Sequence, residues 1–128
     1  MILDWTQGGL AEGLRCYRAG EFFAAHEHWE AVWLHAPEPE KTFLQALIQL
    51  AAAFHHLRRN NLNGARSLLA GALKRLGPYP ASFQGVSVSS LGDEIRRCMR
   101  EVEKQSVRLA SPSIHISSIA KAGAAYDR

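Results

Sequence analysis

Apolar residues recur every three to four positions along most of this chain, and short polar or glycine- and proline-containing breaks separate the repeating segments. This spacing is typical of α-helices, because residues three and four apart fall on one face. The pattern predicts an all-α fold, a single-domain bundle of about five helices. The expected helices cover residues 4–19, 21–36, 40–59, 62–76 and 91–109.

Glycine, proline and asparagine mark the expected helix ends. Gly20 ends the first helix, and the Pro-Glu-Pro segment 37–39 closes the second, since proline cannot continue a helix. The two asparagines at 60–61 stop the third helix, because asparagine tolerates the left-handed conformation found at helix ends. Residues 79–90 show no period and are expected to form a wrapping loop, with Ser90 as N-cap of the fifth helix.

The third predicted helix is apolar around most of its circumference, so it should be the central and most buried one. It carries one polar stripe, in which Gln45, Gln49, Ala52 and His56 repeat at spacings of four, three and four. A buried amide or imidazole without a partner costs about 1–3 kcal/mol. The stripe therefore requires polar neighbours.

A helical wheel of the second helix places His26 in one sector with Phe22, Trp29 and Trp33, and Glu30 at the edge of that sector. We expect the stripe of the third helix to face His26 and Glu30, so that the two helices share a hydrogen-bonded polar seam. In this interpretation the seam locks the register of two packed helices. The protein is then a binding or structural module.

The alternative is a metal-dependent hydrolase. His26 and Glu30, one turn apart, can reach one divalent ion, and His56 can supply a third ligand from the other helix. Glu27 would then act on the metal-bound water as the catalytic base, with Gln45 and Gln49 orienting ligands or substrate. A zincin needs a second histidine where Glu30 stands, so the specific two-histidine motif is absent. We favour the binding or structural module.

Composition fits one compact helical domain. Of the 128 residues, 47% are hydrophobic and 21% are charged. No apolar run approaches the ~20 residues of a membrane-spanning helix, and the N-terminus lacks a basic segment followed by an apolar one. A cytoplasmic protein is expected. Cys16 and Cys98 lie far apart in no metal-binding spacing, which predicts free thiols.

The net charge and the apolar helix surfaces indicate which binding partners to expect. The net charge of +3 is small enough to reflect ordinary solvated helix faces, so a nucleic-acid partner is not favoured. The apolar third helix and segment 62–76 suggest a homodimer, whereas the sequence specifies no small-molecule ligand.

The C-terminal segment differs from the rest of the chain in composition and in its expected order. Residues 1–109 are expected to form the helical domain, and the serine- and alanine-rich residues 110–128 a tail. Residues 114–116 could pair as a short strand, but we expect the tail to be disordered or loosely packed.

Two motif blocks resemble a known family. A His-Glu-x-x-Glu-x-x-Trp block at residues 26–33, a Gln-x-x-x-Gln block at 45–49, and the residues that follow make the chain similar, over about residues 10–80, to the domain of unknown function 309. The resemblance implies an all-helical fold and a family without an established activity, for which a metal-dependent hydrolase has been suggested on motif grounds. The family's motif positions fall here on His26, Glu27, Glu30, Trp33, Gln45, Gln49, His56, Asn61 and Gly64. Trp33 and Asn61 would thus join the two glutamines in the polar network.

Overall fold

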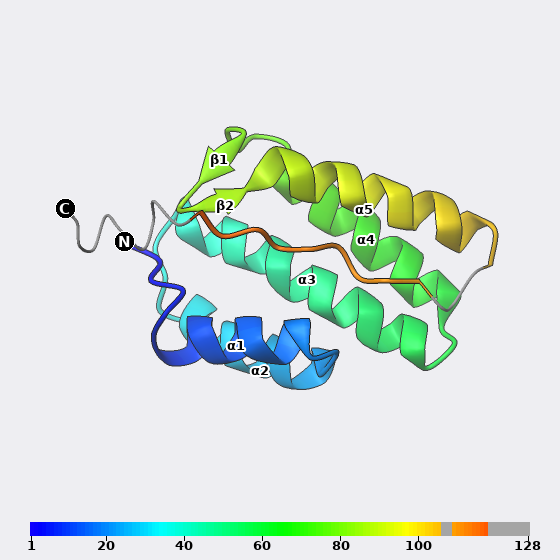
Figure 1. The fold of residues 1–128 in the computed structure, drawn as a ribbon, viewed down its shortest axis with the longest axis horizontal. Coiled ribbons are helices and arrows are strands. Elements are labelled where there is room, and N and C mark those ends of the chain that lie inside the picture. Colours follow the sequence, from blue (N-terminus) through cyan, green and yellow to red (C-terminus); the bar gives the residue numbers. More distant parts are fainter. Residues whose placement is uncertain (106–108, 118–128) are drawn as a thin grey trace.

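The computed structural model describes residues 1–105 and 109–117, and this part of the chain contains five α-helices and one short β-hairpin (Figure 1). The all-α prediction is confirmed. In chain order the elements are α1 (Gly8–Arg18), α2 (Phe22–Trp33), α3 (Glu40–Arg58), α4 (Leu62–Leu76), β1 (Ser82–Phe83), β2 (Val86–Ser87) and α5 (Val88–Glu103).

Helix α3 is the central helix, as its apolar circumference predicts. It packs against both α2 and α4, while α1 packs on α2 and α5 packs on α4. The large side chains of α3 are fully buried: Phe43, Leu44, Leu47, Leu50 and Phe54. Each contributes about 1.5–3 kcal/mol relative to an exposed position, so α3 organises the core.

Helices α1 and α2 form a close hairpin because Gly13 of α1 leaves room for the indole of Trp29 of α2. The Trp29 side chain is fully buried, and its Nε1 donates to the carbonyl of Leu10 at 3.4 Å. A Cβ added at Gly13 would overlap the Trp29 indole. The ring of Tyr17 lies on the same indole, with centroids 5.8 Å apart. This contact fixes how closely α1 approaches α2.

The predicted loop at residues 79–90 contains structure that the periodicity missed. Ser82 and Phe83 pair with Ser87 and Val86 in an antiparallel hairpin. Its two turn residues have positive φ, which is typical of tight hairpin turns. Helix α5 follows at once, so its N-cap is Ser87 rather than the predicted Ser90, and it ends earlier than expected. Strands of two residues are too short to show an alternating pattern.

Residues 109–117, called the C-terminal strap below, cross the molecule between α1 and α5 (Figure 1). Ile114 is 2% exposed, Ile116 forms a bridge with Val86, and the carbonyl of His115 accepts from the amide of Ser87 at 3.1 Å. The expectation of a loosely packed or disordered tail is wrong for these residues. In place of the short strand considered for residues 114–116, the structure has a single β-bridge at Ile116. The rest of the expected tail, 118–128, lies outside the described residues.

Two further expectations can be compared with the structure. Cys16 and Cys98 are free and buried, as predicted. Within residues 1–105 and 109–117, no helix is both long and apolar enough to cross a membrane.

The glycine in the α1–α2 contact generates the first prediction. Gly13→Ala should lower the free energy of unfolding by about 1–3 kcal/mol or more, because the Trp29 indole must leave its packed position. Gly92→Ala is the matched control, since a Cβ there meets only ordinary contacts at 3.6 and 3.8 Å and alanine favours a helix by up to about 1 kcal/mol. Urea unfolding measures both. An equal loss in the two variants would contradict the close-contact explanation.

The strap generates the second prediction. Tyr17 Oη donates to the carbonyl of Pro112 at 2.6 Å in a buried position, and burial raises the pKa of Tyr17 well above its usual range. Tyr17→Phe should destabilise the protein by about 1–3 kcal/mol, because the carbonyl loses its partner away from water. Tyr79→Phe is the control, since its hydroxyl donates to the carbonyl of Pro39 at an exposed site where water can substitute. Denaturant titration should show a clearly smaller loss of unfolding free energy for the control. Equal losses would mean that the buried Tyr17–Pro112 hydrogen bond stabilises the protein no more than the exposed one of Tyr79.

Candidate functional site

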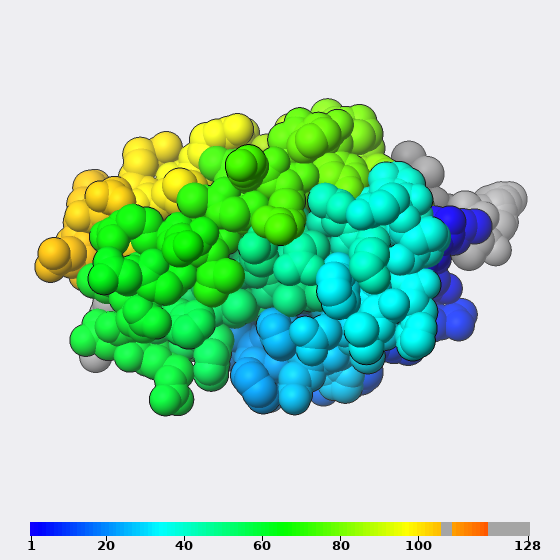
Figure 2. Space-filling view, turned by 180° about the vertical axis from the view of Figure 1, so that it is seen from behind, coloured from blue at the N-terminus to red at the C-terminus, as the bar shows by residue number. Residues whose placement is uncertain are grey.

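The polar stripe of α3 lies on the surface left open between α2 and α4. Gln45, Gln49, Ala52 and His56 are half-buried, whereas most of α3 is buried. Figure 2 shows this side of the molecule, with α3 at the floor of a shallow hollow between α4 and α2. We call this surface the α2–α4 face: the α3 stripe together with the edges of α2 and α4 that border it.

The glutamine in the middle of the stripe binds α4. Gln49 Oε1 accepts from Arg75 Nη1 at 3.2 Å. A Cβ at Gly71 would come 3.1 Å from Gln49 Nε2, so the glycine lets the amide lie close against α4. The partner of this amide is therefore on α4, not on α2 as predicted.

His56 belongs to the corner between α3 and α4. Asn61 Oδ1 caps α4 by accepting from the amide of Gly64 at 3.0 Å, and Asn61 Nδ2 lies 3.0 Å from His56 Nδ1. An amide NH₂ only donates, so Nδ1 accepts and a neutral His56 carries its proton on Nε2. A Cβ at Gly64 would come 2.6 Å from Asn61 Nδ2. These three motif residues thus form one helix junction.

His26 stands apart from that junction. Its ring is half-buried and stacks on Phe23, with centroids 6.0 Å apart and planes at 13°. Its Nδ1 is buried and has no hydrogen-bond partner in the described part of the chain. Glu30 is exposed, and no hydrogen bond or ion pair joins its carboxylate to another described residue. The predicted seam between α2 and the stripe is therefore not hydrogen-bonded, because Gln49 binds α4 and His56 binds the α3–α4 corner.

The predicted metal ligands are not gathered into one group. Among residues 1–105 and 109–117, no three histidine, cysteine, aspartate or glutamate side chains are placed to hold a metal ion together. His56 faces a further obstacle, since a metal at Nε2 would require the proton to move to Nδ1, which faces the Asn61 donor. Glu27 is exposed on α2. This arrangement gives the hydrolase alternative no support.

Helix α2 runs antiparallel along the stripe. At one end of the face Phe23 lies beside His55, with ring centroids 5.3 Å apart. At the other end Lys41 Nζ lies 4.1 Å from the centroid of the Trp33 ring and donates to the Trp33 carbonyl at 2.9 Å. Trp33 is therefore held by a cation and not by the predicted polar network. The middle of α2 lies level with the middle of α3.

Sequence reasoning missed two residues of this face. Phe23 is 53% exposed, which is unusual for a large aromatic side chain, and it contacts the rings of both His26 and His55. His55 lies beside His56, with centroids 5.9 Å apart. The adjacent histidine pair was visible in the sequence, but only the fold brings Phe23 to it.

Burial lowers the pKa of His55, and its neighbours Arg59, His56 and His26 lower it further. Near neutral pH its imidazole is therefore uncharged, which suits a ring packed against Phe23.

Sequence comparison finds a family for the part of the chain that includes α2 and α3. Residues 10–68 match the family described as "Domain of unknown function (DUF309)". Over these residues, the chain belongs to that family. The match ends within α4, so it includes the His56 junction and Gln49 but not Arg75, α5 or the strap.

Two relatives carry similar segments. The chain is 31% identical over 94 residues to an uncharacterised protein of Aquifex aeolicus (strain VF5), covering 73% of this chain. It is 37% identical over 57 residues, 44% of this chain, to the uncharacterised protein YpuF of Bacillus subtilis (strain 168). The aligned parts make up only 27% and 33% of those relatives, so the chain matches about a third or less of their length.

The histidines of this DUF309 domain generate the third prediction. His55 has a lowered pKa, so the unfolded chain binds its proton more readily, and its contribution to stability is present above about pH 6.5 and lost as pH falls through the folded pKa. The unfolding free energy should fall more between pH 7 and pH 5 in the wild type than in His55→Phe, which keeps the ring contact with Phe23. His35→Gln, at an exposed position, is the control. Identical dependence of the unfolding free energy on pH in wild type and His55→Phe would refute the lowered pKa of His55.

Proposed function

We propose that this DUF309 domain is a binding module that pairs with a second copy of itself through the α2–α4 face. The observation that carries the proposal is a pair of opposite, unpaired charge groups on the two sides of this face. Glu27 and Glu30 on α2 are exposed and have no ion-pair partner among the described residues. Lys74 and Arg75 lie on α4, and neither forms an ion pair with any residue that the structure describes.

The two charge groups lie at the same level along α3. The contact between Gln49 and Arg75 fixes the position of the basic group beside the middle of α3. Glu27 and Glu30 occupy the middle of α2, which lies level with the same part of α3. A twofold axis parallel to α3 would lay α2 of each copy over α4 of the other. Acidic and basic groups would then meet twice, as an isologous interface requires.

Apolar side chains support the same face. Exposed ion pairs contribute only about 0–1 kcal/mol each, so a stable interface also needs apolar burial. Phe23 and Leu34 are 53% and 59% exposed, and on a helical wheel they share one sector with Glu27 and Glu30. An apolar residue thus stands at each end of the acidic row.

No observation favours a second function. The metal-dependent hydrolase lacks a gathered ligand set among the described residues, and we do not put it forward. A cytoplasmic location belongs to the proposal, supported by the two free, buried thiols.

Charge reversal tests the proposal. By sedimentation equilibrium at micromolar concentration the wild-type chain should be a dimer. Glu27→Lys/Glu30→Lys should weaken dimerisation by about tenfold or more, because like charges then face each other across the interface. Lys74→Glu/Arg75→Glu should do the same, and mixing the two variants should restore a heterodimer.

Glu12→Lys is the matched control, since Glu12 is an exposed glutamate of α1 that pairs with Arg15. Its dimerisation should equal that of the wild type. A monomeric wild type, or a mixture of the two reversed variants that fails to associate although each is folded by circular dichroism, would overturn the proposal.

A further inference from the structure

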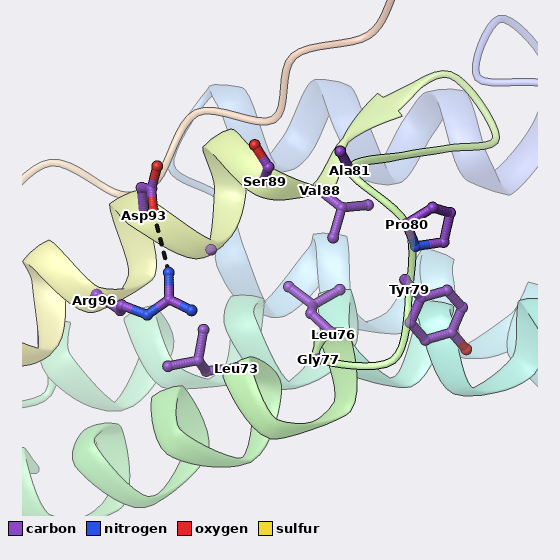
Figure 3. A pocket seen from close by; sticks show the side chains of 11 residues that line it. Leu73, Leu76, Gly77, Tyr79, Pro80, Ala81, Val88, Ser89, Asp93 and Arg96 are labelled. Carbon is purple, nitrogen blue, oxygen red and sulfur yellow. Dashed lines mark hydrogen bonds and ion pairs between the residues drawn. The ribbon is translucent and has the colours of Figure 1, made fainter.

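A second surface feature lies between α4 and α5, away from the stripe of α3. It is a half-open cavity of about 340 Å³ beneath the segment that joins α4 to the hairpin. Figure 3 shows its apolar walls, with Leu73 and Leu76 from α4, Val88 from α5, and the ring of Tyr79 at one end. An apolar cavity of ~150 Å³ can hold a benzene ring, so this one accommodates a ring with a short side chain.

A glycine of α5 keeps this cavity open. Gly92 is a buried helical residue that lines the cavity, and a glycine inside a helix costs about 0.5–1 kcal/mol relative to alanine. Packing does not require it, because an added Cβ would meet Arg96 Nη1 and Leu73 Cδ1 at ordinary distances of 3.6 and 3.8 Å. The backbone does not require it either, since its φ is not positive. What the glycine provides is space for another molecule to approach α5.

One cation stands at the edge of the cavity. Arg96 Nη1 donates to Asp93 Oδ1 at 3.1 Å, and Figure 3 shows the guanidinium reaching over Leu73 toward the cavity. A guanidinium has five N–H donors, so donors remain for a ligand. The first two amides of α5 are not available, because Val88 and Ser89 donate to the carbonyl of Ala81 at 2.8 and 3.2 Å. Among the described residues that line the cavity, Arg96 is the one cation that an anion can contact.

We propose that this cavity, the α4–α5 pocket, binds a small monocarboxylate with an aromatic or branched apolar body. The body packs on the apolar walls, and the carboxylate takes the guanidinium N–H donors of Arg96 that Asp93 leaves free. Asp93 orients the guanidinium and offsets part of its charge, so a monoanion suits the site better than a phosphate dianion. The proposal is independent of dimerisation, because α4 presents different sides to the pocket and to the α2–α4 face.

Phenylacetate is the probe, and phenylacetamide is its neutral isostere. In a titration of the full chain followed by ¹H–¹⁵N NMR, phenylacetate up to ~10 mM should give saturable shifts at the Leu73, Val88 and Gly92 amides, with a dissociation constant of about 1 mM or lower. Phenylacetamide should bind about tenfold more weakly or not at all.

Three variants complete the test. Arg96→Gln should weaken phenylacetate binding about tenfold or more, and Arg100→Gln, one turn further along α5 and outside the pocket, should leave it unchanged. Gly92→Leu should abolish binding by filling the cavity. Equal binding of acid and amide, wild-type affinity in Arg96→Gln, or no saturable shift at the pocket amides would each overturn the proposal, and these outcomes remain decisive if Gly92→Leu fails to fold.

Discussion

Burial of the central helix α3 is the interaction on which the other elements depend. Its large apolar side chains, including Phe43 and Phe54, are completely removed from water. Helices α2 and α4 both pack on it. A helix so enclosed can expose only a narrow stripe. Gln45, Gln49 and His56 lie in that stripe, and they form the α3 part of the α2–α4 face.

Helix packing gives the motif residues of this DUF309 domain a structural explanation. His56, Asn61 and Gly64 form the corner where α3 turns into α4, and Gln49 joins the two helices through Arg75. A histidine whose Nδ1 accepts from an asparagine amide presents an N–H to the surface. Such a ring is a hydrogen-bond donor rather than a metal ligand. The motif is consequently compatible with a role in joining helices.

Helix α4 separates two surfaces with different chemistry. Its α3 side carries Arg75, which binds Gln49, whereas its α5 side forms the wall of an apolar pocket. The first surface relies on charges distributed along a helix, and the second on enclosed space next to one arginine. Because the residues involved do not overlap, each surface can be altered without changing the other.

The sequence by itself determined the helices that have strong local signals. Helix α4 begins and ends at the predicted residues 62 and 76, and α3 is the buried centre that its apolar circumference indicates. Both properties follow from periodicity and stop signals among neighbouring residues. The sequence also identified the stripe of α3, because its spacing is a property of one helix.

Tertiary structure alone decided the partners of that stripe, the start of α5 and the packing of the strap. Gln49 and Arg75 are 26 positions apart, and Tyr17 and Pro112 are 95 apart. No local pattern encodes such pairs, since either side chain could be satisfied by other groups until the helices are placed. The strap has little apolar periodicity. Its packing comes from the burial of Ile114 and from hydrogen bonds to α1, α5 and the hairpin, which form only after those elements have assembled.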